Sequence, residues 1–561
     1  MNIDGLWVAQ RSDLLYLAGQ PARFDAVKLL FTDPGLLDEG ASLGVRGEFR
    51  RLPVGADFHA RAMTNAITRA TALDLALTAE RERLCPGRVL QGWDFGVFYL
   101  ALLRLSVAQQ LAVLVEQTFP EARIGLLRPS KPQQMYFDSF VVTDIVTARD
   151  PARFVVVDAY DTVRWYRDDT TALVFDAPTI AAHMAAGRIT AVTHVPTCFY
   201  DRPWIVDEVA RAHRVTLDLP SPLWDVPVHR GGPLQRPMVD VPPSPTTQRY
   251  REAALRVLDA HFSDLLPLPL PRRQQIDAWA TRCAWQAANY EALAEGLHGH
   301  RPHFLLSDQD TGLNGPLFSL ADALAAPITV MPHSGHASMR LPHGRRVQVV
   351  ERPGYGTQPR TLLGQAVPLR SVRYGHACER QPHTRLRALC LMLNSLNTEG
   401  LSYVDAFALT GFYKPLAALC TAADVQLVLR PKPGGPTLGL LSGVLGIPVE
   451  ELVRHTIEPL PSLAQRCAAV VAFGEPTTGV APFLDAGSLV LQVHEQAWPA
   501  DLLACMPLVA DGVIPLLDSA AALALLQTLL ADPALFQQRR AQQNTAFDAR
   551  AAGAHAHLFD S

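Results

Sequence analysis

The stretch from Leu389 to Gly435, LCLMLNSLNTEGLSYVDAFALTGFYKPLAALCTAADVQLVLRPKPGG, carries the clearest fold signal in the chain. Residues 389–393 form a short, wholly apolar run, which is typical of a strand that is buried on both faces. A polar loop at 394–400 and a helical pattern at 404–422 follow, and then a second apolar run at 425–429. A strand, a helix and another strand in this order predict a parallel sheet in a doubly wound α/β fold.

The same alternation continues on both sides of this stretch. Toward the C-terminus it predicts short helices at 440–445 and 449–453, strands at 467–473 and 488–493, and closing helices at 518–530 and 534–547. Toward the N-terminus it predicts a right-handed β–α–β unit with a strand at 304–306, a helix at 315–325 and a strand at 328–331.

Composition divides the chain into four parts. Residues 1–219 alternate strand and helix patterns and predict an N-terminal α/β region. A connector follows at 220–245, where eight prolines exclude a helix or a central strand. Residues 246–384 are predicted to complete the N-terminal lobe and a hinge, and 385–561 to form a C-terminal Rossmann-like domain, which the resemblance described below implies to bind a nucleotide sugar. Within 340–387, ten arginines against two acids indicate either a hinge whose arginines face a phosphate or a solvated loop.

The overall charge and the cysteine spacing restrict the classes of function. The 561 residues carry 50 basic and 54 acidic side chains, a net charge of −4, so no global positive field attracts nucleic acid. The start of the chain lacks a leader pattern, and polar residues interrupt the longest apolar tract, at 99–115, so we expect no transmembrane segment. The eight cysteines are at least twelve positions apart, which fits reduced thiols. We expect a cytoplasmic protein, with contact at the inner face of the membrane left open.

Ligands of open parallel sheets bind beyond the carboxyl ends of the strands. Five loops at such positions are polar or glycine-rich, and together they predict one shared cleft: 307–314, 332–338, 394–400, 430–435 and 474–479. In the fourth loop, Arg430 and Lys432 alternate with prolines, and Gly434 allows a ligand close to the backbone. This pattern suits a phosphate or diphosphate, the alternative being a surface turn with two solvated cations.

Two more of these five loops contain candidate ligand-binding residues. Asn394 opens the loop after the first strand of the C-terminal half. In the loop 474–479, Glu475 could accept hydrogen bonds from ribose hydroxyls. Thr477 and Thr478 precede a short helix, where hydroxyls and N–H groups predict an anion site, the alternative being a threonine that only caps the helix.

The candidate catalytic residues lie at the ends of two strands in the first half. His333, in Pro-His-Ser-Gly, is a candidate base or a donor to phosphate, the alternative being a structural histidine. Asp308 and Asp310 are candidate bases or binders of sugar hydroxyls, and their spacing also resembles a metal-binding pair, which we consider the weaker interpretation. The motifs HExxH, GxxxxGK[ST], GxGxxG and GxSxG are absent from the sequence.

The pattern resembles glycosyltransferases of the GT-B type, in which two Rossmann-like domains face each other across a nucleotide-sugar cleft. Residues 518–537 are similar to the closing helix pair of that class, and the loops at 430–435 and 474–479 fall where it binds donor phosphate and ribose. The segment 303–336 resembles the end of the N-terminal domain in bacterial surface-polysaccharide transferases. The resemblance covers about residues 300–550 and lacks the usual Glu-x7-Glu. It implies a fold of two facing Rossmann-like domains with an additional N-terminal α/β region.

The resemblance implies a metal-independent glycosyltransferase of bacterial surface glycan synthesis that moves a sugar from a nucleotide-activated donor to a saccharide, lipid-linked or protein acceptor. The nucleotide sugar is a co-substrate, and no cofactor is expected. Arg430 and Lys432 would stabilise the leaving phosphate, and His333, Asp308 or Asp310, in that order, would deprotonate the acceptor. A nucleotide-sugar 2-epimerase on the same fold and a non-catalytic sugar- or nucleotide-binding module are the alternatives.

Overall fold

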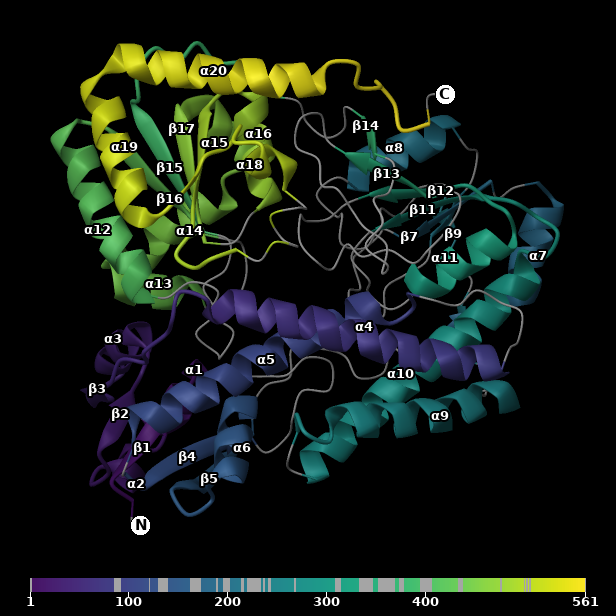
Figure 1. The fold of residues 1–561 in the computed structure, drawn as a ribbon, viewed down its shortest axis with the longest axis horizontal. Coiled ribbons are helices and arrows are strands. Elements are labelled where there is room, and N and C mark those ends of the chain that lie inside the picture. The colour runs from purple at the N-terminus through teal and green to yellow at the C-terminus, as the bar shows by residue number, and fades with distance from the viewer. Residues whose placement is uncertain are drawn as a thin grey trace.

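The structure is a computed structural model with three parallel sheets and a layer of long helices (Figure 1). It describes residues 3–84, 92–120, 122–129, 140–161, 173–187, 190–194, 202–212, 216–218, 234–235, 238–240, 244–266, 269–307, 314–331, 347–351, 369–372, 378–393, 406–431, 437–474, 477–498, 500, 503 and 506–559. The prediction of an α/β fold with parallel sheets is confirmed.

The N-terminal sheet has five parallel strands in the order β3-β2-β1-β4-β5. These are β1 (Gly5–Val8), β2 (Leu29–Phe31), β3 (Glu48–Phe49), β4 (Ile124–Pro129) and β5 (Phe154–Tyr160). The helices around them are α1 (Arg11–Ala18), α2 (Pro21–Phe24), α3 (Pro34–Ser42) and α6 (Phe140–Arg149). The chain runs from β1 outward to β3 and later returns to the other side of β1 with β4. The strand order therefore reverses between β1 and β4, as in Rossmann-like sheets.

The middle sheet has seven parallel strands in the order β14-β13-β12-β11-β7-β8-β9. These are β7 (Ala191–His194), β8 (Thr216–Asp218), β9 (Leu234–Gln235), β11 (His303–Ser307), β12 (Ile328–Met331), β13 (Val347–Glu351) and β14 (Leu369–Ser371). Helices α7 (Ala177–Ala185), α8 (Arg202–Ala212) and α11 (Asn314–Ala323) accompany them. The strand order reverses between β7 and β11, so this sheet is also Rossmann-like and draws strands from both sides of the segment 220–245.

Short elements lie in segments that the sequence marks as breaks. The edge strand β9 and strand β10 (Met238–Asp240), which pairs antiparallel with β6 (Leu173–Phe175), both lie in the proline-rich segment. Strands β13 and β14 lie in the arginine-rich segment, so the interpretation of 340–387 as a hinge or solvated loop is wrong for these two stretches. They are short, and the arginines and glycines in the segments around them conceal the strand pattern.

The C-terminal sheet has five parallel strands in the order β16-β15-β17-β18-β19. These are β15 (Ala388–Leu393), β16 (Gln426–Arg430), β17 (Ala469–Phe473), β18 (Leu489–Val493) and β19 (Leu516–Leu517). Every residue of β15, β17 and β18 is buried, because helices cover both faces. The apolar runs that predict these strands, interrupted only by Gln492 in β18, follow from this double burial.

Helices and one short 3-10 turn accompany the described strands of the C-terminal sheet. They are α12 (Ala406–Ala422), α13 (Thr437–Leu445), α14 (Val449–Ile457), α15 (Leu460–Arg466), η2 (Thr478–Val480), α16 (Ala481–Asp485), α18 (Pro507–Ala510), α19 (Ser519–Ala531) and α20 (Pro533–Ala551). The two closing helices start at aspartate caps. Asp518 accepts a hydrogen bond from the N–H of Ala521, and Asp532 accepts from those of Ala534 and Leu535. Each cap satisfies N–H groups that lack a partner within the helix, so α19 and α20 each start at a defined residue.

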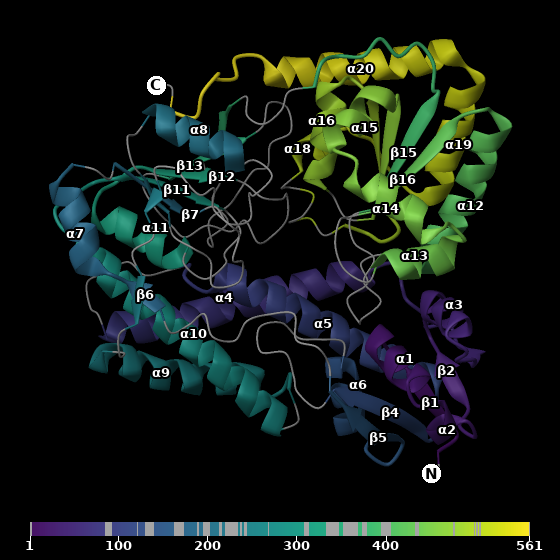
Figure 2. The same ribbon diagram turned by 180° about the vertical axis from the view of Figure 1, so that it is seen from behind.

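Four long helices form a layer beneath the middle sheet and beside the N-terminal sheet (Figures 1 and 2). They are α4 (Phe58–Leu84), α5 (Phe95–Thr118), α9 (Pro245–Phe262) and α10 (Pro269–Gly296). Helix α10 begins inside the sequence LPLPLP at 266–271, because proline is tolerated in the first turn of a helix. Phe98, Phe262 and Trp279 join α5, α9 and α10 in one aromatic core.

A buried charge network joins this layer to the turn before α5. Arg81 of α4 forms a salt bridge with Asp94 and a hydrogen bond with the hydroxyl of Tyr250. Asp74 accepts hydrogen bonds from the N–H groups of Gly92 (3.0 Å) and Asp94 (2.9 Å). Burial and the neighbouring Asp94 carboxylate raise the pKa of Asp74. The network holds the turn at Gly92 in place against the helices.

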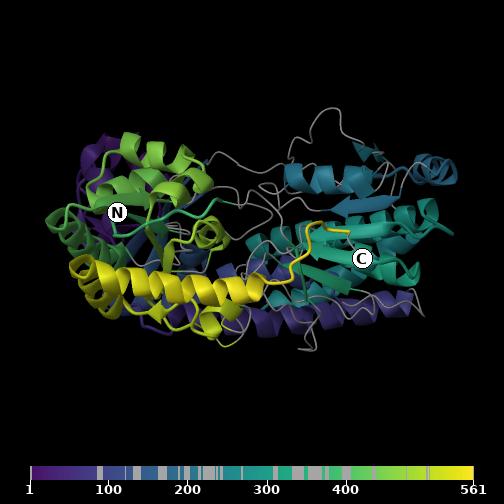
Figure 3. The ribbon, with the colours of Figure 1, turned by 90° about the horizontal axis from the view of Figure 1, so that it is seen from above.

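The C-terminal tail returns to the middle sheet. After α20, the N–H of His555 donates to the carbonyl of Ser371 (2.9 Å), and the N–H of Leu558 donates to Glu208 of α8 (2.8 Å). The Leu558 side chain is 1 % exposed and packs with Leu305 and other core residues of the middle sheet. Figure 3 shows α20 and this tail running from the C-terminal sheet to the middle sheet. The tail therefore connects two parts that have separate cores.

Candidate functional site

The strand order of the C-terminal sheet identifies one place where a crevice between loops is expected. From β15 the chain crosses to β16 on one side and later to β17 on the other. The loops after β15 and β17 therefore leave the sheet in opposite directions, and ligands of open α/β sheets bind at such a switch point. The described residues at this edge include Arg430 and Pro431 after β16 and the turn from Thr477 to Val480 after β17.

Arg430 is the last residue of β16 and pairs in register with Met392, near the end of β15. Its side chain is buried, at 7 % exposure, and its Nη1 donates a hydrogen bond to the carbonyl of Pro431 (3.1 Å). A guanidinium stays protonated at any physiological pH. Its burial excludes the alternative of a solvated cation on a surface turn, and its predicted phosphate-binding role stays a prediction.

The loop after β17 is held by backbone and side-chain hydrogen bonds. Gly474 has a φ of +88°, and its N–H donates to the carbonyl of Val493 (2.9 Å). The buried side chain of Gln492 donates to the carbonyl of Gly474 (2.9 Å). The hydroxyl of Thr477 accepts a hydrogen bond from the N–H of Gly479 (3.1 Å). Thr477 therefore shapes the 3-10 turn, which is the capping role that the sequence leaves as the alternative to anion binding.

Most of the predicted site residues lie outside the described part of the chain. Among them are Asp308, Asp310, His333, Asn394, Lys432, Gly434 and Glu475, and of Thr478 only the backbone is described. In sequence, Asp308 and Asp310 follow β11, and His333 follows β12, two neighbouring strands of the middle sheet. Arg430 and Thr477 belong to the C-terminal sheet. The predicted catalytic and donor-binding roles of these residues stay predictions.

The carboxyl edge of the C-terminal sheet lies against the carboxyl edge of the N-terminal sheet. Helix α13, which follows β16, packs on α3, which follows β2. Gly443 of α13 lies so close that an added Cβ would be 3.0 Å from the Cβ of Asp38. The N–H of Ala497, after β18, donates to the carbonyl of Ala56, after β3 (2.9 Å). Phe407, at the start of α12, contacts the ring of Phe49 with a centroid distance of 5.2 Å.

Asp13, at the facing edge of the N-terminal sheet, is a titratable residue that sequence reasoning missed. Its fully buried carboxylate accepts hydrogen bonds from the Tyr160 hydroxyl (2.6 Å), the Gln10 side chain (3.1 Å) and the N–H of Ala9 (3.1 Å). Burial raises the pKa of Asp13 to about 7, against these hydrogen bonds. The signal in the sequence is the polar run from Gln10 to Asp13 directly after the apolar strand β1.

His59, near the start of α4, is a second residue that sequence reasoning missed. Its N–H donates to the side chain of Gln496, which follows β18 (2.8 Å). Burial lowers the pKa of His59 to about 4, so the imidazole is neutral at physiological pH. Its partner is 437 positions away in the chain, and no local pattern indicates such a contact. His59 contributes to the junction between the two edges.

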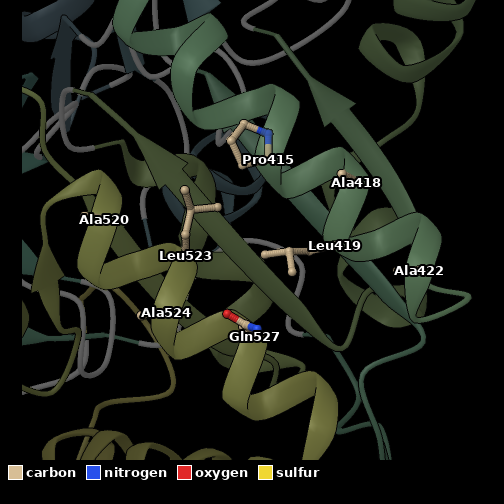
Figure 4. Close-up of a pocket in the computed structure, with 8 residues that line it drawn as sticks. All are labelled: Pro415, Ala418, Leu419, Ala422, Ala520, Leu523, Ala524 and Gln527. Carbon is tan, nitrogen blue, oxygen red and sulfur yellow. The ribbon is translucent and has the colours of Figure 1, made fainter.

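An apolar groove of about 560 Å³ lies on the outer side of the C-terminal sheet, between α12 and α19 (Figure 4). Its lining residues are Pro415, Ala418, Leu419, Ala422, Ala520, Leu523, Ala524 and Gln527. Only Gln527 among them is polar, and no cation or hydroxyl is present in this lining to bind a phosphate. The groove therefore lacks the chemistry of a nucleotide site.

The described residues were also compared with the requirements of a metal site and of a membrane-spanning helix. Within the described ranges, no group of three His, Cys, Asp or Glu side chains is arranged to hold a metal ion. Over the same ranges, no single helix is long and apolar enough to cross a membrane; α19 and α20 reach that length only together and are bent by 118°.

The chain matches no protein-family model and no curated protein at the level of sequence. Among solved structures, it is similar to the crystal structure of the glycosyltransferase VinC in complex with dTDP. The identity is 12% and the TM-score is 0.30, and the match covers 64% of this chain and 95% of the other. A similarity at this level leaves function to be argued from the residues of this chain.

Proposed function

We propose that this protein is a glycosyltransferase that binds a nucleotide-activated sugar at the carboxyl edge of the C-terminal sheet. The observation that supports this most is the buried guanidinium of Arg430 beside the β15/β17 switch point. A diphosphate is the ligand that such a cation and such a sheet edge suit best. Lys432, Gly434, Asn394, Glu475, Thr477 and Thr478 are proposed to complete the donor site.

Sugar transfer requires that the charge of the leaving phosphate be stabilised as the bond to the sugar breaks. Arg430 can supply that positive charge without a metal ion, because a guanidinium donates two parallel hydrogen bonds to phosphate oxygens. The adjoining edge of the N-terminal sheet supports the proposal, since its loops reach the same side of the C-terminal sheet as Arg430. A base then deprotonates the acceptor hydroxyl, and we propose His333 for this role, with Asp308 and Asp310 next.

The proposal also concerns the acceptor molecule and the biosynthetic process in which the protein acts. A saccharide, a lipid-linked glycan or a protein could each present the hydroxyl that is glycosylated, and bacterial surface glycan synthesis is the proposed context. The resemblance of the segment 303–336 to bacterial surface-polysaccharide transferases supports this choice. The 2-epimerase and the non-catalytic module differ from it in a measurable way, because only a transferase releases more nucleotide when an acceptor is added.

The experiment is calorimetric titration of nucleoside diphosphates into the wild type and Arg430→Gln. Losing a charge-assisted phosphate contact is expected to weaken binding roughly ten- to a hundred-fold, or about 1.5–3 kcal/mol. Arg454→Gln, an exposed arginine on α14, is the control and should bind as the wild type does. Nucleotide release is then measured with and without acceptor, and after EDTA, which should leave turnover intact. Equal binding by Arg430→Gln and the wild type would contradict the donor site.

A further inference from the structure

Exposed cations gather at the β3 edge of the N-terminal sheet. Lys28, directly before β2, and Arg50, directly after β3, both form salt bridges with Glu48. Arg46 and Arg51 flank the same strand, one on either side, and all four cationic side chains are exposed. Glu48 is the only acid between positions 41 and 56. These four residues therefore form a surface of net positive charge, which we call the β3 cation patch.

A large apolar side chain is exposed beside this patch. Leu43 directly follows α3, three positions before Arg46, and is 43 % exposed. Water solvates a cation well but not a leucine, so the two side chains together suit a partner that is charged at its surface and apolar beneath it. A membrane with anionic headgroups has this structure, because its acyl chains begin directly below the charged layer.

Helix α12 connects the β3 cation patch to the apolar groove between α12 and α19. The guanidinium carbon of Arg51 lies 4.7 Å from the centroid of the Phe407 ring, at the start of α12. Helical spacing places Lys414, Ala418 and Ala422 on the same face of α12 as Phe407. Lys414 is a further exposed cation, and the two alanines line the groove. Figure 1 accordingly shows β3, α12 and α19 at one end of the molecule.

The groove has the composition of a surface that contacts hydrocarbon. Seven of its eight lining residues are apolar, and no residue of α19 carries a charge. Its alanines on α12 and on α19 are exposed, namely Ala418, Ala422, Ala520 and Ala524. Covering such a surface with an acyl chain removes apolar area from water and leaves no charge without a partner. The groove of about 560 Å³ is therefore suited to a lipid chain.

We propose that this end of the molecule binds an anionic membrane, with the β3 cation patch on the lipid headgroups and an acyl chain in the groove. The cations attract the lipid phosphates, and the groove takes up the apolar chain. A nucleic acid or an acidic protein would pair with the cations but would gain nothing from an uncharged groove. The proposal does not depend on the donor site, because none of these residues belongs to it. If the protein transfers sugars, this surface suits a lipid-linked acceptor.

Co-sedimentation of the full-length protein with phosphatidylcholine vesicles, with and without phosphatidylglycerol, measures this binding. Each lysine or arginine near an anionic membrane strengthens binding roughly fivefold, so Arg46→Gln/Arg50→Gln should bind phosphatidylglycerol vesicles roughly 25-fold more weakly than the wild type. Arg249→Gln/Arg256→Gln removes two exposed arginines of α9 and is the control of equal charge, which should bind as the wild type does. Added salt should weaken the binding of the wild type, because it screens exposed charges.

A second variant tests the groove. Ala418→Glu places a carboxylate where the acyl chain is proposed to lie and should weaken binding at least roughly tenfold. Ala422→Glu, one turn further along α12, should have the same effect, and Ala260→Glu, at an exposed position of α9, is the control. The Tm of each variant should stay at the wild-type value, because every substituted position is exposed.

Three results would overturn the membrane surface. They are a wild type that does not bind phosphatidylglycerol vesicles, test variants that bind these vesicles as the wild type does, and a wild type that binds a DNA duplex as tightly as the vesicles. The last result would make the β3 cation patch a general site for polyanions. Loss of nucleoside diphosphate binding in Arg430→Gln bears on the proposed donor site alone.

Discussion

At the residue scale, Asp13 gives the protein a pH-dependent stability. Burial raises its pKa from 3.8 to about 7, so the folded state binds the proton more tightly than the unfolded state does. The stabilisation is fully present below the unfolded pKa and is lost as the pH rises through about 7. A tenfold difference in proton affinity between the two states corresponds to about 1.4 kcal/mol, so this stabilisation amounts to a few kcal/mol at most.

We expect Asp13→Asn to flatten the fall in Tm between about pH 4 and pH 7, because the unfolded and folded pKa values bound that range and an amide does not titrate. Burial also raises the pKa of Asp144 to about 6. The stability that this carboxyl contributes therefore also falls as the pH rises, over a range that ends near pH 6. Thermal unfolding across this range measures the slope. Asp25→Asn, at an exposed position, is the control and should show the same slope of Tm against pH as the wild type. An unchanged slope in Asp13→Asn would show that the proton is bound elsewhere.

His333 carries the kinetic prediction of the proposed mechanism. We expect His333→Ala to lower kcat at least ~100-fold, the lower range for losing a general base. Donor Kd should change less, because the proposed phosphate contacts lie on the C-terminal sheet. Turnover, donor binding and Tm are measured on the same variant. Parallel loss of kcat and donor affinity would make His333 a phosphate ligand, and a normal kcat would remove it from the mechanism.

At the element scale, the approach of the turn at Trp93 to α11 requires a glycine. An alanine at position 315 would place its Cβ 2.1 Å from the Cα of Trp93, and a backbone atom cannot move aside cheaply. We expect Gly315→Ala to destabilise the protein by about 2–4 kcal/mol, in the range for overpacking that shifts the backbone. Gly411→Ala, in α12 with nothing within 4 Å of the added Cβ, should instead stabilise by about 0.5–1 kcal/mol.

Chemical denaturation of both glycine variants measures these two free energies. The comparison separates the close contact from the general effect of glycine on a helix, because both positions are helical. If Gly315→Ala were as stable as Gly411→Ala, α11 would not lie against Trp93.

At the scale of the whole molecule, the C-terminal tail links two separate cores. Leu558 fills a cluster of the middle sheet, while α20 packs on the C-terminal sheet. Glu208 accepts the N–H of Leu558 and pairs with His557 and Arg211. We expect truncation after residue 551 to lower the free energy of unfolding by several kcal/mol. This is roughly what burial of one leucine and a paired carboxylate contributes.

Limited proteolysis and calorimetry check the role of the tail. In the truncated chain the middle sheet should be cleaved faster than the C-terminal sheet, and the unfolding transition should broaden or split. Leu558→Ala in the full chain should have the same effects on cleavage and unfolding, but smaller ones, because it creates a cavity and keeps the backbone contacts. A truncated chain that unfolds in one transition at the wild-type temperature would contradict the link.

The sequence by itself determined the type and order of the C-terminal elements. The runs at β15 and β17 are apolar throughout, and that at β18 apart from Gln492, because both faces of these strands are buried. The aspartates before α19 and α20 mark the helix starts. It also placed Arg430 at the carboxyl end of a strand. The short strands β13 and β14 have no comparable pattern, because a few residues carry no period. The same holds for single residues such as Asp13 and His59.

Only the tertiary structure decided which strands are neighbours and which edges meet. Strand β7 pairs with β11 across more than a hundred intervening residues, and Asp13 meets Tyr160 at a separation of 147. Local sequence patterns indicate how much of an element is buried. Which strands and side chains become neighbours depends on long-range packing that brings distant segments together. The burial that shifts the pKa of Asp13 and the contact of α3 with α13 exist only once the chain has folded.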